Sequence, residues 1–181
     1  MAENPAFKAL SALAQLSQSH AQALPAQVDA SPRWSGIGFS LLGCRFVAPL
    51  GQISEMLEVP NYTKLPGVQS WVVGLANVRG RLLPLFDMSQ YLGGKATSQR
   101  KQHRVLVIDS NNFYSGLIVD QAYGMQHFTS EVYSEQLDSA IPEVVKPLVN
   151  GTYEDASGFN WSVLHVPALL DDPHFANVAA A

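Results

Sequence analysis

One stretch decides the fold: GLANVRGRLLPLFD, residues 74–87, where two apolar runs flank a short polar segment. Asn77 and Gly80 tolerate the backbone dihedrals of a turn, so the pattern predicts a hairpin with Arg79 on the turn. The apolar residues of the two expected strands are Val72, Val73 and Leu75 before the turn, and Leu82, Leu83, Leu85 and Phe86 after it. A cationic side chain on a turn favours docking rather than catalysis.

Arg79 is the candidate binding residue on this turn. Its guanidinium presents up to five donors in a fixed fork, which suits a carboxylate or a backbone carbonyl of a partner. The alternative is that Arg79 pairs within its own loop, because exposed ion pairs form readily and contribute little energy. The sequence pattern alone leaves both readings open.

The surrounding residues resemble the CheW family of chemotaxis coupling proteins. The resemblance rests on the run 74–80, on Leu83-Pro84-Leu85-Phe86-Asp87 and on Tyr91-Leu92-Gly93. It extends upstream through Phe39, Val47, Pro49, Ile53, Glu55, Met56, Leu65-Pro66 and Trp71, downstream through 115–125, and covers about residues 35–172. Within the family, Trp34-Ser35-Gly36-Ile37-Gly38-Phe39 and Val47-Ala48-Pro49 are similar to adaptors of type IV pilus chemosensory systems.

The resemblance implies a mainly β fold with two five-stranded SH3-like β-barrel subdomains and short helices. It implies a non-catalytic adaptor that couples methyl-accepting chemoreceptors to a CheA-type histidine kinase and controls twitching motility by type IV pili. A kinase-independent scaffold for receptors or a pilus regulator is the alternative. The resemblance places receptor binding at Asn77, Arg79, Gly80 and Glu55, and kinase binding at Ile53, Met56 and Leu57.

Composition excludes several other classes. The net charge of −4 provides no long-range attraction to nucleic-acid phosphates, and we read the basic run Arg100–Arg104 as a solvated connector. The longest apolar stretches are too short for a membrane helix, and the first residues lack the basic and apolar regions of a signal peptide, so we expect a cytoplasmic protein. The family resemblance implies that it associates with receptor arrays at the inner membrane. Cys44 is the single cysteine and is expected to pack as a small hydrophobe.

No catalytic motif emerges from the titratable residues. The five histidines, at 20, 103, 127, 165 and 174, lack metal-site spacing, and phosphate-binding and nucleophile-elbow motifs are absent from the sequence. His165 is expected inside a strand as a structural residue. Asp87, Asp109 and Asp120 each follow an apolar run, and we expect them to make turns. We therefore expect no enzyme activity, no metal and no cofactor.

The chain divides into an N-terminal extension, residues 1–34, and a domain, residues 35–175, whose two halves meet near 94–104. In the extension, the spacing of Phe7, Leu10, Leu13, Ala14, Leu16 and Ser17 predicts a short amphipathic helix, followed by a linker at 21–33. The helix is expected to dock on its own domain or on a partner. In the domain we expect a hairpin of strands 36–42 and 45–48 with its turn at Gly43-Cys44. We expect a strand or single turn at 52–57 and a helical turn at 68–73. Further strands are expected at 105–108, 113–119 and 161–166, with a turn at 109–112.

Overall fold

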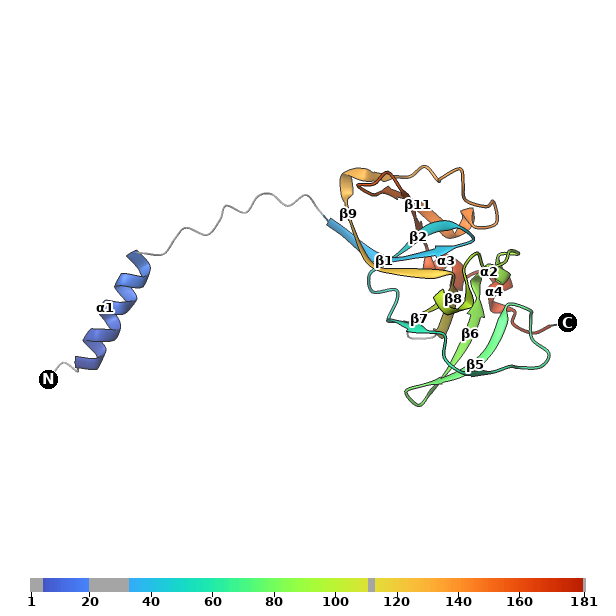
Figure 1. Cartoon of the computed structure of the whole chain (residues 1–181), viewed down its shortest axis with the longest axis horizontal. Coiled ribbons are helices and arrows are strands. Elements are labelled where there is room, and N and C mark those ends of the chain that lie inside the picture. The colour runs from blue at the N-terminus through green and yellow to red at the C-terminus, as the bar shows by residue number, and fades with distance from the viewer. Residues whose placement is uncertain (1–4, 20–32, 111–112, 181) are drawn as a thin grey trace. The chain divides into compact units, whose positions relative to one another are not determined.

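The structure is a computed structural model that describes residues 5–19, 33–110 and 113–180. The chain forms two compact units, Met1–Ser31 and Pro32–Ala181 (Figure 1). The first unit carries helix α1 (Pro5–Ser19), as the spacing of its apolar residues predicts. On this helix the side chains of Phe7, Leu10 and Leu13 are exposed. The expected linker, apart from Arg33, and Asn111-Asn112 of the expected turn lie outside the described residues.

The second unit is built from two six-stranded sheets, so the mainly β prediction is confirmed. One sheet, which we call the central sheet, is formed by one continuous part of the chain, with the strand order β3-β7-β8-β6-β5-β4. Its strands are β3 (Glu55–Glu58), β4 (Tyr62–Thr63), β5 (Val72–Val78), β6 (Arg81–Asp87), β7 (Arg104–Ser110) and β8 (Phe113–Val119). β4 and β3 are the two edges of this sheet.

The other sheet, which we call the split sheet, takes strands from both ends of the domain in the order β10-β11-β12-β2-β1-β9. Its strands are β1 (Arg33–Leu41), β2 (Cys44–Pro49), β9 (Gln121–Thr129), β10 (Tyr133–Ser134), β11 (Val149–Glu154) and β12 (Asn160–Leu164). β12 lies parallel to β2, with Ser162 opposite Phe46. Because β1 and β2 join this sheet, a cut near 94–104 does not separate the two sheets. Each sheet has five strands of at least four residues and one two-residue edge strand, β4 or β10.

Two local predictions are wrong, and a third is only partly correct. The β1–β2 hairpin turns at Leu42-Gly43, one residue earlier than expected, with positive φ at both positions. The helical turn expected at 68–73 is reduced to one hydrogen-bonded turn, in which the Val72 amide donates to the Gln69 carbonyl at 3.0 Å. Val68 and Gln69 pair with the C-terminal segment, where the Gln69 amide donates to the Val178 carbonyl at 3.0 Å. His165 follows β12 instead of lying inside it.

Short helices connect the strands. They are α2 (Met88–Tyr91), α3 (Val166–Leu170), α4 (Pro173–Ala176) and three 3₁₀ turns, η1 (Arg100–Gln102), η2 (Ser130–Val132) and η3 (Lys146–Leu148). Asp87 begins α2: its carboxylate accepts from the backbone N–H of Gln90 at 3.1 Å, as a helix N-cap does. None of the helices among the described residues is long and apolar enough to span a bilayer.

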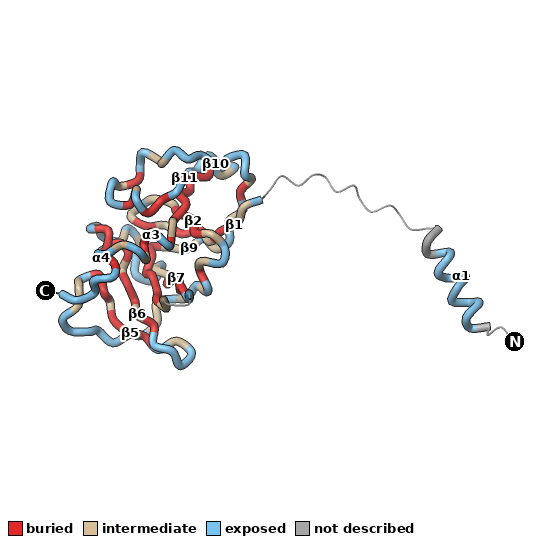
Figure 2. Tube along the Cα trace, turned by 180° about the vertical axis from the view of Figure 1, so that it is seen from behind, coloured by how far each residue is buried: buried red, intermediate tan, exposed pale blue. Residues whose placement is uncertain are grey.

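One large hydrophobic cluster lies between the two sheets. Phe39 and Phe46 of the split sheet, whose ring centroids are 5.7 Å apart, pack in the same cluster as Leu106 and Leu117 of the central sheet. Figure 2 shows buried residues running along β6 and β7 of the central sheet. A second cluster on the central sheet contains Leu83, Leu85, Val105, Val107, Ala76 and Ile118. The two sheets therefore form one body through their shared core.

A buried carboxylate joins the parts of this body. Asp120, which is 1% exposed, lies between β8 and β9. Its oxygens accept hydrogen bonds from the Leu42 amide at 3.1 Å, from the Ser89 hydroxyl at 3.2 Å and from the Thr97 hydroxyl at 2.6 Å. Asp120 thus links three segments distant in sequence, a larger role than the local turn expected of it.

Candidate functional site

The β5–β6 hairpin holds Arg79 at its tip. Arg79 and Gly80 both have positive φ, 51° and 82°, so the reversal is of the type whose twist matches that of the paired strands. A positive φ costs glycine little but strains a residue with a side chain, which marks Arg79 as a position of interest. The Asn77 side-chain oxygen accepts a 2.9 Å hydrogen bond from the Gly80 amide and fixes the turn. The predicted hairpin and turn are confirmed.

The guanidinium of Arg79 is oriented by one carboxylate. Its Nη2 lies 2.8 Å from Oε2 of Glu55, the first residue of β3. The Arg79 side chain is nevertheless 78% exposed, whereas that of Glu55 is 24% exposed. Glu55 therefore holds one edge of the guanidinium, and its other donors remain accessible to a partner. Binding to a partner and pairing within the protein are therefore compatible for Arg79, because a weak internal ion pair preorganises the exposed guanidinium.

A second arginine, Arg81, lies beside this pair and was missed by the sequence argument. It makes two contacts with Asp109: Nη1 to Oδ2 at 2.6 Å and Nη2 to Oδ1 at 3.4 Å. Its Cζ lies 3.7 Å from the centre of the Tyr114 ring. The hydrogen bond to Asp109 raises the pKa of Arg81, so its charge is firmly held. The signal in the sequence was the pair of arginines flanking Gly80.

These groups surround one small hollow. Its volume is about 210 Å³, and it is lined by Ser54, Glu55, Val78, Arg79, Arg81, Asp109 and Tyr114. The ion pairs Arg79–Glu55 and Arg81–Asp109 therefore line the same hollow. The arrangement provides guanidinium donors for carbonyl or carboxylate groups and contains no nucleophile with a partnered base. It is suited to recognition.

The three residues predicted to contact the kinase differ in accessibility. Ile53 is buried and belongs to the large core cluster. Leu57 is half-buried and packs against the second cluster. Met56, between them on β3, is 42% exposed. The kinase-binding prediction stays untested, and Met56 is its accessible member.

Three other titratable residues discussed from the sequence, Cys44, Asp87 and Asp109, have structural partners. The Cys44 thiol lies 3.4 Å from the Ala140 carbonyl, and burial raises its pKa, which favours the neutral thiol. Asp87 caps α2, and Asp109 binds Arg81. Within residues 5–19, 33–110 and 113–180, no three His, Cys, Asp or Glu side chains gather as a metal site would require.

Comparison with known proteins identifies the family. The model of the CheW-like domain matches residues 35–174. Protein PilI of Pseudomonas aeruginosa is 45% identical over 159 residues, covering 88% of this chain and 88% of PilI. The chain therefore belongs to the CheW-like family.

Two further relatives extend this similarity. The chemotaxis protein CheW of Helicobacter pylori is 29% identical over 137 residues, which is 75% of this chain and 79% of that protein. The crystal structure of the scaffolding protein TtCheW from Thermoanaerobacter tengcongensis matches with a TM-score of 0.62 at 17% identity, over 74% of this chain and 89% of that one. At this identity the structural match supports the fold alone, and it agrees with the observed two-sheet body.

Proposed function

We propose that the chain is a non-catalytic adaptor that couples a methyl-accepting chemoreceptor to a CheA-type histidine kinase. Membership of the CheW-like family supports the adaptor role. The 45% identity to PilI, together with the resemblance of residues 34–39 and 47–49, supports a pathway that controls type IV pilus motility. In this proposal the protein acts in the cytoplasm, at receptor arrays on the inner membrane.

The observation that carries the proposal is the presentation of Arg79. The guanidinium is held at a hairpin tip by the positive-φ turn and by Glu55, yet most of its surface is open. A fixed, exposed guanidinium binds carbonyl and carboxylate groups with little further loss of side-chain entropy. We assign receptor contact to Arg79 and Glu55, with Asn77 and Gly80 shaping the turn.

Kinase contact is assigned to the face of β3 that presents Met56. Glu55 and Met56 are consecutive in a strand, so their side chains point to opposite faces of the sheet. Ile53 and Leu57 then act as the packed support of this strand, because both contact the core clusters. One short strand thereby contributes to the receptor site on one face and to the kinase site on the other.

Kinase autophosphorylation in a reconstituted mixture tests the proposal. Receptor-containing vesicles and kinase are combined with wild-type protein, with Arg79→Ala, or with Arg33→Ala as an exposed arginine outside the site. Coupling predicts a receptor-dependent change in phosphorylation with wild type and Arg33→Ala, and a reduced change with Arg79→Ala. If the protein still binds the receptor but leaves kinase autophosphorylation unchanged, the result would support the kinase-independent scaffold instead.

A further inference from the structure

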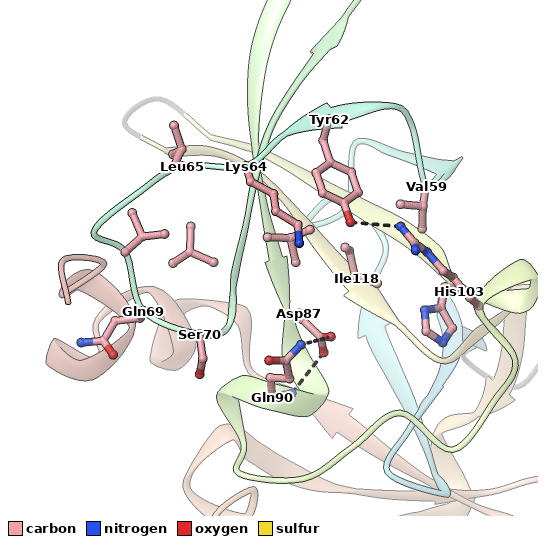
Figure 3. A pocket seen from close by; sticks show the side chains of 14 residues that line it. Val59, Tyr62, Lys64, Leu65, Gln69, Ser70, Asp87, Gln90, His103 and Ile118 are labelled. Carbon is pink, nitrogen blue, oxygen red and sulfur yellow. Dashed lines mark hydrogen bonds between the residues drawn. The ribbon is translucent and has the colours of Figure 1, made fainter.

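A groove at the β4 edge of the central sheet is separate from the Arg79 site. One of its two hollows has a volume of about 530 Å³, and Figure 3 shows Tyr62, Lys64 and His103 around it. A second hollow shares Val59, Tyr62, Lys64, Arg100 and His103 with the first and extends along residues 58–61 to Arg104. The two hollows form one elongated groove. None of the four residues assigned to receptor contact lines it.

The groove carries positive charge in an acidic chain. Lys64 comes from the segment after β4, whereas Arg100, Lys101 and His103 come from η1 and its end. The guanidinium of Arg100 donates to the Tyr62 hydroxyl at 3.0 Å, which places this charge beside the ring. Among the described residues, Lys64, Arg100 and Lys101 have no carboxylate partner. The basic run 100–104, which we interpreted from the sequence as a solvated connector, therefore lines the same groove as Lys64.

Two carboxylates, Asp87 and Glu58, border the groove, and neither binds one of these three cations. Asp87 accepts from the backbone N–H of Gln90 and from its side chain, at 3.1 and 2.9 Å (Figure 3). Glu58 Oε1 lies 3.9 Å from Nη2 of Arg104 and is 87% exposed. Neither carboxylate neutralises the three unpaired cations, so the groove keeps a net positive charge for an incoming anion.

The groove also has an apolar floor and an open backbone edge. Ile118 is buried in the second hydrophobic cluster, and Val59 and Val73 pack against that cluster at the floor. β4 pairs with β5 on one side only and is an edge of its sheet. In the described part of the chain, residues 59–66 make no other backbone hydrogen bond. Unpaired edge groups accept an added extended strand.

We propose that this groove binds an acidic, extended peptide segment of a partner protein. The segment aligns with β4, and its alternate residues face the groove. Its carboxylates contact Lys64, Arg100 and Lys101, and an apolar side chain two residues from a carboxylate reaches Val73 and Ile118. The groove is elongated and runs beside a free strand edge, so it suits an extended peptide better than a compact anion. The interaction is additional to receptor contact at Arg79 and kinase contact at Met56.

Fluorescence anisotropy with a labelled peptide of the repeat Glu-Ser-Val-Ser, which places Glu and Val on the same face of an extended strand, tests this binding on the full chain. The control peptide carries Gln in place of every Glu. Wild type is expected to bind the Glu peptide more tightly than the Gln peptide, and added salt to weaken binding because the pairs are exposed. Equal binding of the two peptides would overturn recognition by charge.

Variants locate the binding. Lys64→Glu should weaken binding about fivefold, from the loss of one favourable exposed pair and the gain of a repulsive one. Arg33→Glu makes the same charge change outside the groove and should have a much smaller effect. Lys101→Glu, also exposed, repeats the test if Lys64→Glu fails to fold by circular dichroism.

Two results would overturn the assignment. If Arg79→Ala weakens peptide binding as much as Lys64→Glu, the peptide occupies the hairpin site and not the groove. If inorganic phosphate displaces the peptide where sodium chloride of equal ionic strength does not, the groove is a phosphate site. Retention of peptide binding by Arg79→Ala and equal competition by the two salts support the proposal.

Discussion

The Thr97 hydroxyl donates a 2.6 Å hydrogen bond to Oδ2 of Asp120. This contact fastens the segment after α2 to the junction of β8 and β9, where Asp120 is buried. The same oxygen accepts from the backbone amides of Thr97 and Leu42, at 3.2 and 3.1 Å. A buried carboxylate is stable only when such donors surround it, so these bonds form one structural unit.

Replacing Asp120 with Asn is expected to lower the free energy of unfolding by about 2–3 kcal/mol, since an amide group loses the charge and turns one acceptor into a donor. Urea denaturation measures the change. Asp171→Asn is the matched control, because Asp171 is exposed and should change stability by less than about 0.5 kcal/mol. Equal loss in the two variants would contradict the structural role of Asp120.

The Tyr91–Asp172 pair predicts a pH dependence of stability. The Tyr91 hydroxyl donates to Oδ2 of Asp172 at 2.6 Å. This bond, together with the His174 amide, lowers the pKa of Asp172, while burial and the bond to Asp172 raise the pKa of Tyr91. A lowered carboxyl pKa stabilises the fold above the unfolded value of about 4, and a raised tyrosine pKa stabilises it below about 10.

The stability advantage of wild type over Tyr91→Phe should therefore be constant between about pH 5 and 9 and shrink on both sides. Below this window Asp172 becomes protonated as the pH falls through its lowered folded pKa. Above it, Tyr91 ionises in the unfolded chain first. Thermal unfolding at several pH values measures the difference, and a pH-independent gap would refute the link.

The sequence predicted local strand pairs better than distant ones. Asn77 and Gly80 mark the β5–β6 turn directly, because their backbone preferences act over a few residues. The parallel pairing of Leu85 with Gly116, and of Ser162 with Phe46, leaves no mark in local periodicity. The helical turn expected at 68–73 is short for the same reason, since Val68 and Gln69 pair with the C-terminal segment.

The candidate sites divide in the same way. Arg79 and its turn were predicted from adjacent residues, and the proximity of Glu55 was implied by the family resemblance. The pairing of Arg81 with Asp109 joins two strands that are not neighbours in sequence, so local spacing gave no signal for the partner of Arg81. The groove was missed because Tyr62 and Lys64 lie far along the chain from Arg100 and meet it only after folding.

Met56→Glu tests the proposed kinase contact. Met56 is exposed, so a charged residue should leave the fold intact and weaken kinase binding by desolvation of the carboxylate at the interface. Met125→Glu is the control, since Met125 is also exposed but lies on β9 of the other sheet. Binding is measured by surface plasmon resonance. Unchanged kinase affinity with Met56→Glu would exclude Met56 from the interface.

Deletion of residues 1–31 tests the role of α1. The remaining chain should stay folded, because all strands and the hydrophobic core clusters of the described residues lie in the second unit. Circular dichroism and the melting temperature report on the fold, and receptor and kinase binding are measured in parallel. A lower melting temperature indicates docking of α1 on its own body, whereas weaker binding alone indicates a partner contact. No change in either would show that the apolar stripe has no docking role.

The most direct measurement of the central claim is receptor binding by Arg79→Ala, assayed by pull-down with receptor-containing vesicles beside wild type and Arg33→Ala. Because Arg79 is 78% exposed, its replacement should change the free energy of unfolding by less than about 1 kcal/mol. The account predicts that Arg79→Ala stays folded and loses receptor binding while Arg33→Ala retains it. Full receptor binding by a folded Arg79→Ala protein would contradict the assignment of the hairpin as the receptor contact.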